Sequence, residues 1–130
     1  MAQTINAISL NNVFNSTAVT LTAVTGSATT AEIVSDISGA QDDLCVLVDL
    51  TAASSGTYTL ECLNGDYNAK GHKLTAELTV GKLNVIPVSS LEIKKYDGKA
   101  AFNLKTDVET GFSVVAVSFA VLKHAYPVNH

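Results

Sequence analysis

The chain is divided into short segments in which apolar and polar residues alternate, and none of them is long enough for an extended amphipathic helix. Within residues 73–80 every second side chain is apolar: Leu74, Ala76, Leu78 and Val80. A period of two places the apolar set on one face of a strand and the polar set on the other. The 130 residues include 15 Val and 14 Thr, which suit a pleated sheet. The sequence therefore predicts an all-β domain.

The other segments of strand length are separated by turn signals. Residues 31–37 fit a strand and a single helical turn equally well, because Ile33, Val34 and Ile37 satisfy both periods. The remaining predicted strands are residues 13–24, 44–50, 57–63, 83–88, 91–95, 100–106 and 113–123. About eight or nine short strands at close spacing predict a two-sheet antiparallel sandwich, either immunoglobulin-like or jelly-roll-like.

Turn residues and patterning also predict how some strands are placed. The Asp97-Gly98 pair predicts a hairpin between residues 91–95 and 100–106, and residues 44–50 and 57–63 predict a second hairpin. Residues 44–50 form a near-continuous apolar run and residues 113–123 are apolar on both faces, so we expect both in the middle of a sheet. Pro87 predicts an edge position for residues 83–88.

Residues 1–12 differ from the rest of the chain. Ile5, Ile8 and Leu10 are isolated apolar positions in a polar, asparagine-containing segment. The pattern predicts an N-terminal arm or edge strand, followed by one sandwich domain over residues 13–130, which is the usual size of a single domain. The three apolar side chains of this segment are candidate partner contacts.

Charge and hydropathy exclude several classes of partner. The chain has 8 Lys, no Arg and 12 acidic residues, for a net charge of -4, so it lacks the basic surface that nucleic acid requires. The longest apolar stretch, residues 114–122, is much shorter than the roughly 20 residues of a membrane-spanning helix. The first residues lack the basic start and apolar core of a signal peptide, so the sequence predicts no secretion.

Cys45 and Cys62 lie on the two strands of the predicted hairpin 44–50/57–63. The register that sets apolar side chains opposite one another points the two thiols to opposite faces. A disulfide would then require a one-residue slip. We therefore expect two free, mostly buried thiols.

Metal-ligating residue types are present without metal-binding spacing. His72, His124 and His130 match no zinc-site spacing. Asp42 and Asp43 form an acidic turn without the EF-hand pattern of calcium ligands. The sequence predicts no catalytic residue, no cofactor and no metal site.

Three of the eight lysines gather near one predicted turn: Lys94, Lys95 and Lys99. We expect them to keep an exposed hairpin soluble and to protect its edge. The alternative hypothesis is that they contact an acidic surface of a partner, which makes them candidate partner-binding residues.

Residues 57–123 contain a series of segments that together carry a resemblance: Thr79-Val80-Gly81-Lys82, Val85-Ile86-Pro87-Val88, Asp97-Gly98-Lys99, Ala101-Phe102-Asn103-Leu104 and the closing apolar strand 114–122. This series is similar to small structural proteins of tailed bacteriophages. In particular, it resembles the auxiliary head proteins that decorate or cement the capsid. The resemblance implies a β-sandwich that binds the assembled shell, often at symmetry axes, and has no catalytic activity.

On this resemblance we expect a non-enzymatic structural virion protein that binds and stabilises the assembled phage capsid. It would be made in the host cytoplasm, lie on the capsid surface and contact the phage major capsid protein, with residues 1–12 ordering against the shell. A homo-oligomer is compatible with such multivalent sites. The alternative is an immunoglobulin-like adhesion or fibre module on a phage or bacterial surface.

Overall fold

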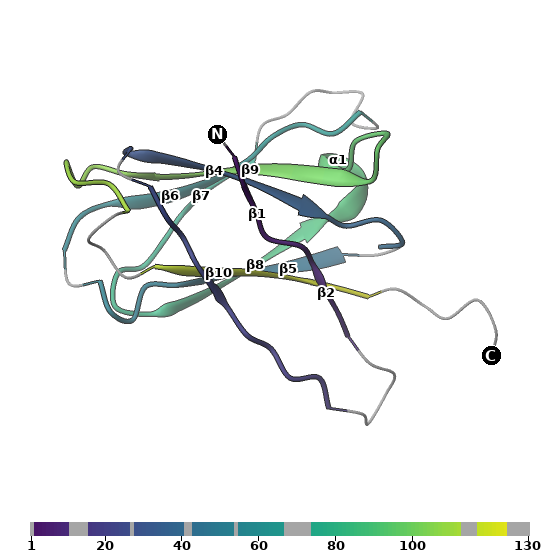
Figure 1. The fold of residues 1–130 in the computed structure, drawn as a ribbon, viewed down its shortest axis with the longest axis horizontal. Coiled ribbons are helices and arrows are strands. Elements are labelled where there is room, and N and C mark those ends of the chain that lie inside the picture. The colour runs from purple at the N-terminus through teal and green to yellow at the C-terminus, as the bar shows by residue number, and fades with distance from the viewer. Residues whose placement is uncertain are drawn as a thin grey trace.

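The computed structural model describes residues 2–10, 16–26, 28–40, 43–53, 55–66, 74–112 and 117–124. These residues form ten strands and one helical turn. The strands build two five-stranded sheets that pack face to face, one above the other in Figure 1. The predicted all-β, two-sheet sandwich is confirmed, with ten strands in place of eight or nine.

We call the two layers sheet A and sheet B. Sheet A has the strand order β1-β4-β9-β6-β7, with bounds β1 Gln3–Thr4, β4 Thr30–Asp36, β9 Lys99–Thr106, β6 Tyr58–Cys62 and β7 Leu74–Glu77. Sheet B has the order β2-β10-β5-β8, with β3 also paired to β10, and its bounds are β2 Ile8–Ser9, β3 Thr22–Ala23, β10 Ser118–Lys123, β5 Asp43–Asp49 and β8 Leu83–Ser89. The long ladders are antiparallel as expected, whereas β1 and β2 pair in parallel with β4 and β10.

The predicted hairpin 44–50/57–63 is wrong. Its strands exist as β5 and β6, but β5 lies in sheet B and β6 lies in sheet A. The buried side chains of both strands point into the core, among them Leu44, Val46 and Leu60. The two apolar faces therefore meet across the core rather than edge to edge.

The predicted hairpin around Asp97-Gly98 is correct only at its turn. The turn closes with hydrogen bonds from Gly98 N to Lys95 O and from Lys95 N to Lys99 O, both 2.9 Å long. The segment before it forms a helical turn, α1 (Ser90–Ile93), instead of a strand. This turn buries Ile93 while it carries the chain from β8 in sheet B to β9 in sheet A.

The strand predicted over residues 13–24 is reduced to β3. Residues 16–21 form no strand, and residues 13–15 lie outside the described residues. The edge of β10 that β3 reaches is also used by β2, so only a short length of it remains for pairing. Residues 31–37, for which the sequence left two alternatives, form β4.

The strand positions predicted from patterning are confirmed in sheet B. β5 lies between β10 and β8, and β10 lies between β5 and the short strands β2 and β3. β8, which contains Pro87, forms an edge of sheet B. Residues 113–116, the first part of the predicted closing strand, lie outside the described residues.

The N-terminal segment crosses from one sheet to the other. β1 pairs with β4 in sheet A and β2 pairs with β10 in sheet B, so this segment spans the side of the sandwich (Figure 1). Ile5, between the two strands, is buried in the core, and its carbonyl oxygen accepts a hydrogen bond from Ser35 Oγ. Residues 3–9 therefore form edge strands that tie the two sheets together.

Candidate interaction surface

The two outer faces of the sandwich differ in polarity. On sheet A, the ladder register places polar side chains in two adjacent rows across β4, β9, β6 and β7. One row is Thr30, Lys105, Thr59 and Glu77, and the next is Glu32, Asn103, Glu61 and Thr75. This outer face is polar, as is usual for a sheet with one face on the core.

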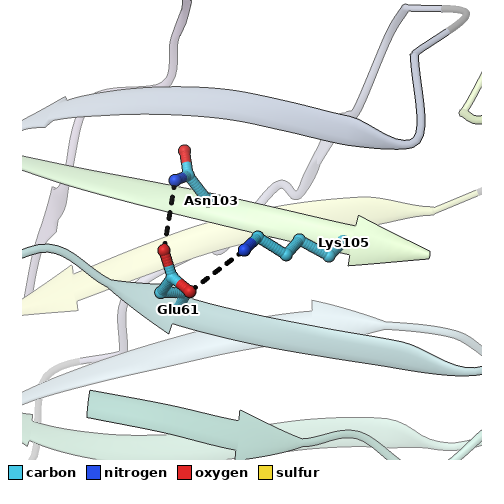
Figure 2. A network of polar contacts seen from close by, with 3 residues as sticks. All are labelled: Glu61, Asn103 and Lys105. Atoms are coloured by element: carbon cyan, nitrogen blue, oxygen red, sulfur yellow. Dashed lines mark hydrogen bonds and ion pairs between the residues drawn. The ribbon is translucent and has the colours of Figure 1, made fainter. Parts of the chain in front are cut away.

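Glu61 is the most buried acidic side chain of sheet A and is held by two neighbours on β9. Its Oε1 accepts a hydrogen bond from Asn103 Nδ2 at 3.3 Å, and its Oε2 pairs with Lys105 Nζ at 3.2 Å (Figure 2). Asn103 lies directly opposite Glu61 in the ladder, and Lys105 lies two residues further along. Both carboxylate oxygens are thus paired, so the network joins β6 to β9 and has a structural role.

The outer face of sheet B is apolar at its centre. In β5, Leu44, Val46 and Val48 point into the core, so Cys45 and Leu47 point outward. The same alternation applies to β10 and β8, and the register then aligns the outward residues of neighbouring strands. We call the resulting patch the sheet-B outer face: Ile8, Cys45, Leu47, Leu83, Val85, Pro87, Ala120 and Leu122.

The part of this patch that lies on β8 is open to solvent, whereas Ile8, Cys45, Leu47 and Leu122 are half-buried. Leu83 is 50% exposed and Val85 is 56% exposed. Ala120 lies on the same outer face, outside the core cluster, and is only 1% exposed. The sheet-B outer face therefore exposes apolar side chains mainly along β8, and an exposed apolar patch is a candidate interaction surface.

One end of the sheet-B outer face is hollowed. A depression of about 300 Å³ is lined by Leu10, Asp43, Cys45, Leu122 and His124. Apolar side chains and the Cys45 thiol form most of this lining, with a carboxylate and an imidazole beside them. The depression extends the apolar patch towards the residues that follow β2.

The structure separates the three apolar candidates of the N-terminal segment. Ile8 belongs to the sheet-B outer face, and Leu10 lines the adjoining depression. Ile5 is 5% exposed and packs in the core, so its side chain does not face outward. Ile8 and Leu10 therefore remain candidates for partner contact.

The three lysine candidates lie elsewhere. Lys94 Nζ donates a hydrogen bond to Ala40 O at 2.9 Å, which fixes this side chain against a loop of its own chain. Lys95 is half-buried, and Lys99 is exposed at the start of β9 in sheet A. None of the three belongs to the sheet-B outer face, and their partner-binding role stays a prediction.

Leu47, Leu83 and Val85 are not among the candidates predicted from the sequence. The signal that could have found them is that residues 44–50 and 83–88 are mostly apolar at both alternating sets of positions, with Asp49 and Asn84 as the exceptions. In a two-layer sandwich only one of these sets can face the core.

Neither a metal-binding cluster nor a membrane-spanning helix is found in the described part of the chain. No group of three or more His, Cys, Asp or Glu side chains there could hold a metal ion, and no helix there is long and apolar enough to cross a bilayer. His72, His130 and Asp42 lie outside the described residues.

Both cysteines are free, as predicted, although for a different reason. Cys45 lies in β5 of sheet B and Cys62 lies in β6 of sheet A, so they belong to different layers rather than to two faces of one hairpin. Cys62 is buried in the core, whereas Cys45 is half-buried on the sheet-B outer face.

The Cys62 thiol should make stability depend on alkaline pH. Burial, with a smaller contribution from the Glu61 carboxylate, raises the pKa of Cys62 from 9.0 to about 11. Between these values the unfolded chain releases the thiol proton while the folded chain keeps it, so the free energy of unfolding falls as pH rises from about 9 to about 11. Urea unfolding at several pH values should show a smaller fall for Cys62→Ala than for the wild type. Cys45→Ala, which keeps Cys62, should retain the wild-type fall, and an equal fall in Cys62→Ala would contradict the assignment.

Comparison with known proteins adds no relative. No protein-family model, no curated protein and no solved structure matches the chain.

Proposed function

We propose that this chain is a non-enzymatic structural protein of a phage virion, which binds the assembled capsid and stabilises it through the sheet-B outer face. The observation that supports a binding role is the exposure of Leu83 and Val85 within a contiguous apolar sheet face. Covering this face with a partner would remove apolar surface from water, at about 25 cal/mol for each Å². The choice of the major capsid protein as partner is supported by the resemblance carried by residues 57–123.

The way the face is built suits a passive stabiliser. β5 and β10 are paired on both sides, and their inward residues, such as Val46 and Phe119, are fully buried. A face fixed from behind by a packed core loses little conformational entropy on binding. If the capsid presents the complementary surface only after assembly, binding shifts the equilibrium towards the assembled shell by mass action.

Cosedimentation with purified phage capsids tests the proposal through one charge introduced on each outer face. Val85→Asp places a carboxylate in the centre of the β8 part of the sheet-B outer face. Burying that charge at an apolar interface should weaken capsid binding by at least about tenfold. Thr75→Asp is the matched control, because it introduces the same charge at an exposed position on β7, the edge strand of the polar sheet.

We expect Thr75→Asp to bind capsids as the wild type does, and both variants to unfold cooperatively in urea. Two results would overturn the proposal. One is a wild-type chain that stays in the supernatant when capsids are pelleted. The other is a folded Val85→Asp variant that binds capsids with wild-type affinity.

A further inference from the structure

Two carboxylates bracket the sheet-B outer face along its central strand. Asp43 is the first residue of β5 and Asp49 is the last, and both belong to the outward set that includes Cys45 and Leu47. They are six positions apart in the strand, which corresponds to about 20 Å along an extended chain. The apolar centre of the face therefore has one acidic group at each end.

Neither carboxylate forms an ion pair with a residue in the described part of the chain, although His124 lines the same depression as Asp43. Asp49 Oδ1 accepts hydrogen bonds from Thr51 N at 2.9 Å and from Thr51 Oγ1 at 2.6 Å, and these bonds lower the pKa of Asp49. The Asp49 charge is thus held in a defined position at neutral pH.

The placement of the charges disfavours a two-fold dimer of this chain in which the two β5 strands are aligned. In a two-fold dimer that packs the two faces together about the middle of β5, the symmetry axis lies between the faces. An axis along β5 sets Asp43 opposite Asp43, and an axis across β5 sets Asp43 opposite Asp49. Either arrangement brings like charges together, which opposes association.

We propose that the partner surface covering the sheet-B outer face is apolar at its centre and carries basic side chains at two points about 20 Å apart, opposite Asp43 and Asp49. This inference rests on the proposed function and names the chemistry of the capsid surface that the chain recognises. Charge pairs at the rim of an apolar contact fix its orientation and speed association more than they add affinity. They are also screened by salt, unlike the apolar centre.

Charge removal on β5, compared with charge removal beside the two ends of β9, tests this inference. The Asp43→Asn/Asp49→Asn variant removes both proposed contacts, and the new amide oxygen at position 49 can still accept the bonds from Thr51. The matched control is Asp97→Asn/Asp107→Asn, which changes the net charge equally. Its two carboxylates flank β9 in sheet A and accept hydrogen bonds from the backbone N–H groups of Lys99 and Thr57, which asparagine can also do.

The probe is the assembled capsid, with binding measured at about 50 mM and about 500 mM salt. At low salt the Asp43→Asn/Asp49→Asn variant should bind about tenfold more weakly than the wild type, while the control should change by less than about twofold. At high salt the difference between the two variants should largely disappear, because the Debye length falls to a few ångströms.

The outcomes separate this inference from the proposed function. If Val85→Asp loses binding but Asp43→Asn/Asp49→Asn behaves as the control does, the basic rim is refuted and the docking face stands. If Val85→Asp and Asp43→Asn/Asp49→Asn both bind as the wild type does, the docking face is refuted as well. If sedimentation equilibrium shows a wild-type dimer that Val85→Asp dissociates, the occupant is a second copy and the inference is overturned.

Discussion

Phe119→Ala should lower the free energy of unfolding by about 3–5 kcal/mol, the usual cost of truncating a fully buried phenylalanine. Phe119 in β10 is 0% exposed and meets Phe102 of β9 edge to face, with the ring centroids 5.4 Å apart and the planes at 61°. The pair joins sheet B to sheet A across the core. Because domains of this size are stable by only about 5–15 kcal/mol, urea unfolding should show a large shift of the midpoint.

The matched control lies on the same strand but on its other face. Leu122 in β10 points to the sheet-B outer face, where it packs beside Cys45 and Ile8 rather than in the core. Leu122→Ala should therefore cost about 1 kcal/mol or less. A loss as large as that of Phe119→Ala would show that the outer face is covered by the chain's own residues, and it would remove the basis for a docking surface.

Alternation within a segment correctly predicts which residues face the core. The inward positions of β5 and β9, such as Leu44, Val46, Phe102 and Leu104, follow from the period of two, since side chains alternate along any strand whatever its partner. The partner of each strand could not be predicted in this way. β5 pairs with β10 and β8, which lie far along the chain, and such pairing depends on packing that one segment does not encode.

The structure of Ser90–Ile93 is a second feature that the local pattern does not predict. Leu91 and Ile93 alternate with polar residues as in a strand, and Asp97-Gly98 is a strong turn signal. The structure instead buries Ile93 within a single helical turn and leaves Leu91 61% exposed. The connection has to pass from sheet B to sheet A, and that requirement outweighs the local pattern.

The apolar outer face is visible in the sequence, but its pattern has two interpretations. Strands that are apolar on both faces are typical of sheets covered on both sides, which is why residues 113–123 are expected in the middle of a sheet. That position is correct, since β10 is an inner strand. The described residues, however, include no helix that could cover the outer side of sheet B, because their single helix, α1, has four residues. Apolar residues on both faces combined with a two-layer fold therefore indicate an interaction surface.

Gly65→Ala is expected to be the other strongly destabilising substitution, by about 3 kcal/mol. Gly65 follows β6, and its N–H donates a hydrogen bond to Glu92 O in α1 at 2.9 Å. A Cβ at this position would lie 2.5 Å from Ile93 C and 2.6 Å from Lys94 N, and closer still to Lys94 O. These are backbone atoms, so the contact can be relieved only by moving the backbone of residues 93–94 or of the loop that contains Gly65.

Gly81→Ala separates this steric effect from the general effect of replacing glycine. Gly81 has a φ of 81°, which alanine adopts at a cost of about 1 kcal/mol, but no other atom lies within 4 Å of the position of its Cβ. Both substitutions reduce the entropy of the unfolded chain to the same extent. In urea unfolding, the free energy of unfolding of Gly65→Ala should therefore be about 2 kcal/mol lower than that of Gly81→Ala. Equal stabilities would contradict the close packing of Gly65 against residues 93 and 94.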